Sequence, residues 1–216
     1  MANSERGDSK IFDDADVKDK LQKFVSLHSS IKGMILYTEE ISNRSNAQEL
    51  LEIRDATDHL VRVLRVELEN KSNSDYEVQN LDKAIGHLCR AGYDVLDWTS
   101  LILRQKMETE LKGFSTDTIT AVLPNYYSEI KPKVLKISTK IAKIREEKDI
   151  GKLTLEEFTE YFEQVEQLKQ YYSEIIDKKS SLIEVQRKNR WKNWIIPIVT
   201  GTIVAVIAYL LGYLKL

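Results

Sequence analysis

The stretch IIPIVTGTIVAVIAYLLGYL, residues 195 to 214, contains no charged side chain. A helix of this length rises about 30 Å, which matches the thickness of the hydrocarbon core of a bilayer. A core helix of a soluble protein rarely needs apolar side chains on every face over such a length. The sequence therefore predicts a transmembrane helix, within a C-terminal anchor at residues 191–216.

Basic and aromatic residues flank this stretch, with Tyr209 and Tyr213 near its far end and a collar before it, made of Arg187, Lys188, Arg190, Trp191, Lys192 and Trp194. Lys and Arg beside a span mark its cytoplasmic side, and Trp and Tyr favour the two interfaces. Only two residues follow the stretch, and residues 1–16 lack the apolar segment of a signal peptide. We therefore expect a single-pass, tail-anchored protein whose N-terminal domain lies in the cytoplasm.

Small residues recur along one face of the expected span, at Gly201, Ala205, Ala208 and Gly212. Such a stripe lets two helix backbones approach closely in a membrane. Small residues are also common in membrane helices in general. The stripe therefore indicates either lateral self-association of the span or only the usual composition of a membrane helix.

The composition predicts an all-α protein. Only eight Gly and three Pro occur among 216 residues, so few residues are suited to the tight turns that join the strands of a sheet. The formal net charge of -2 gives no global argument for nucleic acid or for an acidic substrate. The sequence shows no glycine-rich phosphate loop and no clustered metal ligands, so we expect no cofactor and no metal. Cys89 and His28 are expected to be packed core residues.

The soluble part is expected to be one domain at residues 13–190, after a disordered N-terminus at residues 1–12. Apolar spacing and capping signals predict about five helices. Four start near residues 13, 47, 76 and 117, and the last of these four should kink or break at Pro124 and Pro132. A fifth should start near Leu155, after the capping box TLEE, and run straight into the membrane. Its apolar seam fits either core packing or a coiled coil.

One local frame, Ala-x-x-His-Leu-x-Arg, occurs on two consecutive expected helices. RDATDHL covers residues 54–60 and is followed by Arg62, and KAIGHLCR covers residues 83–90. Small residues beside a histidine in the same frame would let the two helices pack closely as an antiparallel pair. The pair would bring His59, His87 and Arg90 toward a shared surface. The repeat can therefore be purely architectural.

The segment RDATDH, in which Arg54 is followed by Asp55 and then His59, resembles the signature of the HEPN superfamily of all-α domains. In that family an Arg precedes a His by four to six residues, and two such motifs usually meet across a dimer. The resemblance implies Arg54 and His59 as catalytic residues of a metal-independent ribonuclease. A His can transfer a proton near neutral pH, and an Arg can stabilise the charge that develops on a phosphodiester.

A small HEPN-like domain with one transmembrane helix resembles the membrane accessory proteins of type VI CRISPR systems. This resemblance implies a protein of the prokaryotic inner membrane that acts in antiviral defence as an oligomeric assembly or pore. Its partners would be the bilayer, further copies of the chain, and RNA or an RNA-guided effector protein. A membrane-tethered ribonuclease and a non-catalytic adaptor remain the alternatives, and the sequence favours a role without catalysis.

Overall fold

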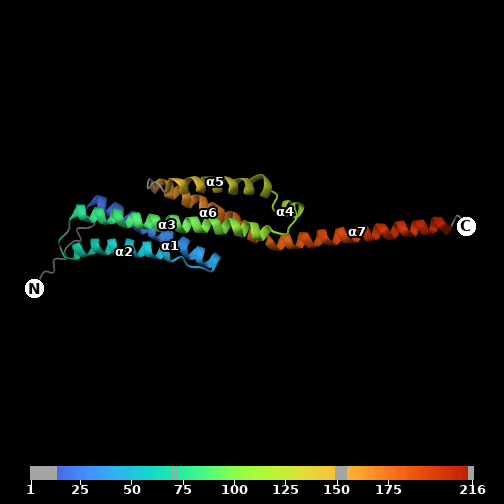
Figure 1. The fold of residues 1–216 in the computed structure, drawn as a ribbon, viewed down its shortest axis with the longest axis horizontal. Helices are drawn as coiled ribbons and strands as arrows, with labels where there is room; N and C mark the ends of the chain where they lie inside the picture. The colour runs from blue at the N-terminus through green and yellow to red at the C-terminus, as the bar shows by residue number, and fades with distance from the viewer. Residues whose placement is uncertain (1–13, 70, 72, 149–154, 214–216) are drawn as a thin grey trace, which may run out of the picture. The chain divides into compact units, whose positions relative to one another are not determined.

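The structure is a computed structural model that describes residues 14–69, 71, 73–148 and 155–213. Its elements are the helices α1 (Ala15–Ser42), α2 (Ala47–Leu68), α3 (Ser74–Leu111), α4 (Thr116–Val122), α5 (Lys131–Lys148), α6 (Leu155–Asp177) and α7 (Lys179–Tyr213), with a π-helical turn η2 (Tyr126–Ile130) before α5 (Figure 1). No strand occurs among these described residues. The all-α class is therefore confirmed. The expected disorder of residues 1–12 and the capping residue Thr154 lie outside the described residues.

Side-chain caps explain where several helices begin. The Asp14 carboxylate accepts hydrogen bonds from the backbone N–H groups of Asp16 and Val17 at the start of α1. Asn46 caps α2 and Ser115 caps α4 in the same way. These bonds satisfy backbone donors that have no partner within the first turn. After the C-terminal end of α3, Gly113 has a φ of 91°, which a glycine adopts without strain.

The fourth predicted helical region divides into three pieces. The chain leaves the helix at Leu123, just before Pro124, as expected. Pro132 instead falls in the first turn of α5, where its missing N–H is tolerated. The turn before it widens into η2, in which the N–H of Ile130 donates to the carbonyl of Asn125 at 3.1 Å. The described residues before the apolar segment consequently form more helices than the five that were predicted.

The expectation of one unbroken helix from Leu155 into the membrane is wrong. Helix α6 ends at Asp177, and α7 starts at Lys179 after a turn at Lys178. The interruption lies in the polar segment DKKSS, residues 177–181, and Asp and Ser have lower helix propensity than the apolar residues on either side. Lys179 forms an ion pair with Glu110 of α3 at this point.

The described chain forms two compact units. The first contains α1, α2, α3 up to Leu103, the end of α5 from Lys140, and α6 up to Glu166. Within it α3 is contacted by every other helix. Helix α1 runs parallel to α3, since Lys20 pairs with Asp82 and Thr38 bonds to Thr99. On the other side, Asp97 of α3 binds both Arg145 of α5 and Tyr161 of α6.

The second unit contains the rest of α3, α5 and α6, together with α4, η2 and α7. Helix α4 packs against α7. The Gln186 side chain donates to the carbonyl of Gly113 at 2.6 Å. Ile175 and Leu182 belong to the apolar seam of the predicted fifth helix and are fully buried here, as Val165 is in the first unit. The seam therefore packs in the core.

Candidate functional site

The repeated histidine frames lie side by side on α2 and α3, in the first unit. Each frame includes a further polar residue, four positions before its alanine. A polar residue is followed by Ala four positions later and by His seven positions later, in the two sets Glu52, Ala56, His59 and Asn80, Ala84, His87. Both alanines are fully buried. The expected antiparallel packing of the two frames is present in the structure.

His87 is held by a carboxylate of the neighbouring helix. Its Nδ1 lies 2.8 Å from Oε2 of Glu52, and Nε–H of Arg90 donates to the same oxygen at 3.0 Å. Nη2 of Arg90 also lies 2.6 Å from Nδ1 of His87. Because an ionised carboxylate only accepts hydrogen bonds, Nδ1 of His87 must carry the proton. It therefore donates to Glu52 and cannot accept from Arg90.

His59 is held by an amide in the corresponding place. Its Nδ1 lies 3.0 Å from Oδ1 of Asn80. The Nδ2 group of Asn80 donates to the carbonyl of Tyr76 at 2.8 Å, which fixes the orientation of the amide. The oxygen thus faces the imidazole, and Nδ1 of His59 is the donor. Both histidines have the same tautomer, with Nε2 as the basic nitrogen of the neutral ring.

The two imidazole rings stack on each other. Their centroids are 5.4 Å apart and their planes differ by 26°. Side chains on a helix lean toward its N-terminus, so histidines on two antiparallel helices lean toward each other. This geometry explains how two rings meet although each one is bonded to a residue two turns away from the other histidine.

Two carboxylates near the stacked rings are each paired with an arginine, Glu52 with Arg90 and Asp55 with Arg54. Burial alone would raise the pKa of Glu52, but the hydrogen bonds and charges of His87 and Arg90 together lower it. The pKa of Asp55 is lowered mainly by its hydrogen bond from Arg54, with further contributions from the charges of His87 and His59. Both carboxylates are thereby kept ionised beside the imidazoles.

Arg54 and His59, the predicted catalytic pair, bond to different partners. Nε and Nη2 of Arg54 lie 3.0 and 2.7 Å from Oδ1 of the adjacent Asp55. His59 instead bonds to Asn80 across the helix pair. In the second frame the two predicted residues, His87 and Arg90, are joined through Glu52. The structure therefore brings the two histidines together and leaves Arg54 on the exposed side of α2, paired with a neighbour.

Sequence reasoning missed Glu52 and Asn80, which orient the two rings. A signal for them was present, because each lies seven residues before a histidine and so on the same helix face. Across an antiparallel pair, the residue two turns before one histidine lies opposite the other histidine. A search for polar residues at that spacing in both frames would have found them.

His28 and Cys89, which were expected in the core, are both only half-buried. His28 is half-buried and stacks on buried Phe24, with ring centroids 6.1 Å apart. Cys89 is half-buried, and burial raises the pKa of its thiol. Within the described ranges, no three His, Cys, Asp or Glu side chains gather as metal ligands would.

The apolar part of α7 is a second candidate site. The helix contains an 18-residue window of mean hydropathy 2.3, and none of that window is buried against the protein. Gly201, Ala205 and Ala208 of the small-residue stripe are exposed, and a Cβ on Gly201 would meet nothing within 4 Å. Gly212 lies on the same helix. This part of α7 is long and apolar enough to cross a membrane.

Comparison of the chain with protein-family models, with curated proteins and with solved structures finds no match.

Proposed function

We propose that the chain is a single-pass protein of the prokaryotic inner membrane, that its helical part lies on the cytoplasmic side, and that it acts as an oligomeric effector in antiviral defence. The exposed apolar part of α7 carries the membrane part of this proposal. A core helix of such composition would be buried, whereas residues 195–211 are exposed on all sides. Exposing such a segment to water would be unfavourable, and a bilayer removes that cost.

Two surfaces support assembly of several copies. The small-residue stripe of α7 allows close approach of neighbouring helices within the membrane. Outside it, helix α2 exposes apolar side chains at the three- and four-residue spacing of a helix-pairing seam, at Val61, Leu64 and Leu68. A second copy of the chain would offer the same seam. These surfaces support an oligomeric assembly or pore over a monomeric anchor.

The histidine cluster supports a structural role over ribonuclease activity. Both rings use Nδ1 to join α2 to α3, and Arg54 is bonded to Asp55 and not to His59. The HEPN-like fold and the defence role rest on the resemblance of RDATDH and on its combination with one apolar helix. An RNA-guided effector protein is the cytosolic partner that this resemblance implies.

Expression in bacterial cells tests the proposal. The full chain should pellet with membranes, resist extraction with alkaline carbonate, and place an N-terminal reporter in the cytoplasm. Cells that express it during phage infection should take up a membrane-impermeant dye and release fewer phage. A chain that stays in the supernatant contradicts the membrane assignment. Normal dye exclusion and normal phage yield, with the chain in the membrane, contradict the effector role.

An RNA-cleavage assay distinguishes the effector proposal from its main alternative, a membrane-tethered ribonuclease. Purified chain that cleaves single-stranded RNA, and loses this activity in His59→Ala at an unchanged melting temperature, would replace the effector proposal with a tethered ribonuclease. Loss of activity at a lowered melting temperature would have to be separated from unfolding by testing Arg54→Gln, because exposed Arg54 bonds only to its neighbour Asp55 in the described structure.

A further inference from the structure

A collar of cations surrounds α7 at the start of its apolar part. It consists of Arg187, Lys188, Arg190 and Lys192, and Trp191 and Trp194 lie among and after them. All six side chains are exposed. The tryptophans are 66% and 71% exposed, which is unusual for side chains of this size.

No ion pair neutralises the collar within the part of the chain that the structure describes. The contrast with the preceding turns of α7 is clear, because Lys179 pairs with Glu110 and Gln186 bonds to the carbonyl of Gly113. These contacts of α7 with Glu110 and Gly113 thus use residues before the collar. The four positive charges remain available to a partner outside the chain.

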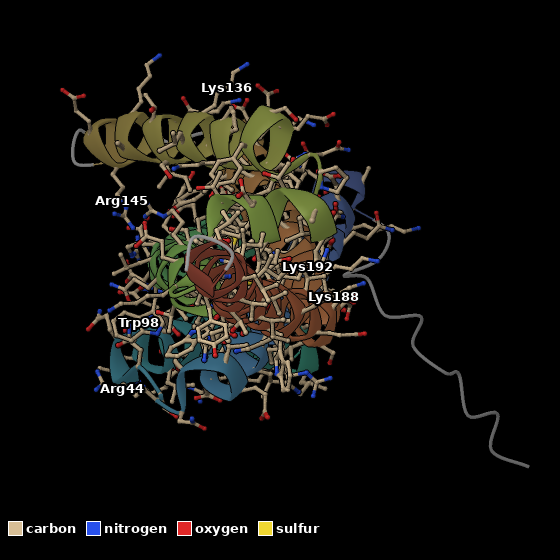
Figure 2. All side chains as sticks on the ribbon, turned by 90° about the vertical axis from the view of Figure 1, so that its right-hand side faces the viewer. Arg44, Trp98, Lys136, Arg145, Lys188 and Lys192 are labelled. Atoms are coloured by element: carbon tan, nitrogen blue, oxygen red, sulfur yellow. The ribbon has the colours of Figure 1, made fainter. Side chains whose placement is uncertain are left out.

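The placement of the collar on the helix indicates what that partner is. At 100° per residue, the four cations point in directions that span more than half of the helix circumference. Two of them, Lys188 and Lys192, lie on the same side of α7 (Figure 2). A flat protein or nucleic-acid surface would contact only one face of such a ring. Residues 187–194 rise about 10 Å along the helix, which is comparable to one headgroup layer of a bilayer.

We propose that residues 187–194 bind anionic phospholipids, with the four cations on the phosphates and the two indoles at the depth of the glycerol backbone. This inference rests on the proposed membrane insertion of α7. Lys and Arg contribute to such binding roughly additively, and each typically strengthens it about fivefold near an anionic surface. The collar therefore does more than orient the span, since it selects lipids around it.

Quenching of tryptophan fluorescence by brominated lipids tests whether the collar of the full chain prefers anionic lipids. The three tryptophans are reduced to the two of the collar by Trp98→Phe, because Trp98 lies on α3. The protein is reconstituted in vesicles that contain phosphatidylcholine and a minor share of phosphatidylglycerol, with bromine on the chains of one lipid or the other. We expect brominated phosphatidylglycerol to quench severalfold more than its share of the lipid predicts, and less at high salt.

Two variants in the Trp98→Phe background provide the comparison. Changing Arg187, Lys188, Arg190 and Lys192 to Gln should reduce the quenching by phosphatidylglycerol to its share of the lipid. The matched control loses the same four charges from exposed positions elsewhere, at Lys18, Lys32, Lys83 and Lys112, and should keep the preference. Equal quenching by both lipids in the parent, or loss of the preference in the control, would overturn the proposal.

Flotation separates this inference from the membrane assignment. A parent protein that floats with vesicles of pure phosphatidylcholine but shows no lipid preference disproves only the inference. A protein that floats with no vesicles disproves the membrane assignment. Inorganic phosphate or an RNA oligonucleotide that removes the preference at matched ionic strength would show a free-anion or nucleic-acid site in place of a lipid site.

Discussion

The stacked histidines show how residues of a motif that resembles a catalytic one also join two helices. His59 belongs to a short motif in which an Arg precedes a His, yet its Nδ1–H donates a hydrogen bond to Oδ1 of Asn80. We expect His59→Ala and His87→Ala each to destabilise the protein by about 1 to 3 kcal/mol, because the first leaves Oδ1 of buried Asn80 without its donor and the second removes one of the two donors to Glu52. Thermal unfolding of the full chain in detergent measures this.

A double mutant sharpens the prediction. Because the rings touch, the His59→Ala, His87→Ala double variant should lose less stability than the sum of the two single changes. Additive losses would show that the rings stack without contributing to stability. Nitrogen chemical shifts of the two imidazoles should report Nδ1–H tautomers, and Nε2–H signals would contradict the hydrogen bonds described here.

Gly92 and Gly33 form a matched pair for close packing. A Cβ on Gly92 would clash with Cε2 of Phe158, whereas a Cβ on Gly33 would meet nothing within 4 Å. We expect Gly92→Ala to cost about 1 to 3 kcal/mol of stability, since the buried ring must move. Gly33→Ala should gain up to about 1 kcal/mol, because Ala favours a helix. Equal melting temperatures of the two variants would contradict this packing.

Glu49 makes stability depend on pH. Burial, with the nearby charges of Asp94 and Glu39, raises its pKa from 4.5 to about 7, against the opposing hydrogen bond from Asn46. The folded state therefore holds a proton that the unfolded state releases between these values, so stability falls as pH rises from about 4.5 to about 7. Glu49→Gln should flatten this decline and stabilise the protein by about 1 to 3 kcal/mol at pH 8. Parallel stability curves for parent and variant would disprove it.

At the scale of elements, the small-residue stripe of α7 predicts how copies meet in the membrane. Replacing Gly201 and Gly212 by Leu should push neighbouring helices apart while the segment stays apolar enough to insert. Crosslinking in membranes should then show fewer oligomers at unchanged membrane content. The control changes Ile203 and Val206 to Leu, on another side of α7, and should keep the parent distribution. The same loss in both variants would place the contact elsewhere.

The sequence predicted most of the elements because their signals are local. Helices α1 and α2, which Asp14 and Asn46 cap, start close to the predicted positions near residues 13 and 47. The turn at Lys178 was missed because DKKSS contains neither Gly nor Pro. The widening of η2 before Pro132 was missed because spacing rules assume an α-helical period. Glu52 and Asn80 were missed because their roles depend on the register between two helices, which single-helix patterns do not specify.

For the whole molecule, insertion of α7 should depend on its lack of charge. Ile203 and Ile207 lie near the middle of the apolar segment and are each 51% exposed. Changing both to Arg should cost about 5 to 7 kcal/mol of insertion free energy and move the protein to the soluble or aggregated fraction. Changing both to Leu should leave it in the membrane pellet. A double-Arg variant that still resists carbonate extraction would contradict a span.

The central position of α3 in the first unit has a consequence for synthesis on the ribosome. Helices α1 and α2 precede α3 and can dock on it as soon as it emerges. Its contact with α6 waits longer, because Asp97 and Tyr161 are separated by 64 residues. At about 5 to 20 residues per second, the surface of α3 around Gly92 and Tyr93 stays uncovered for about 3 to 13 seconds. During that interval the nascent three-helix intermediate should be the form of this chain that chaperones bind.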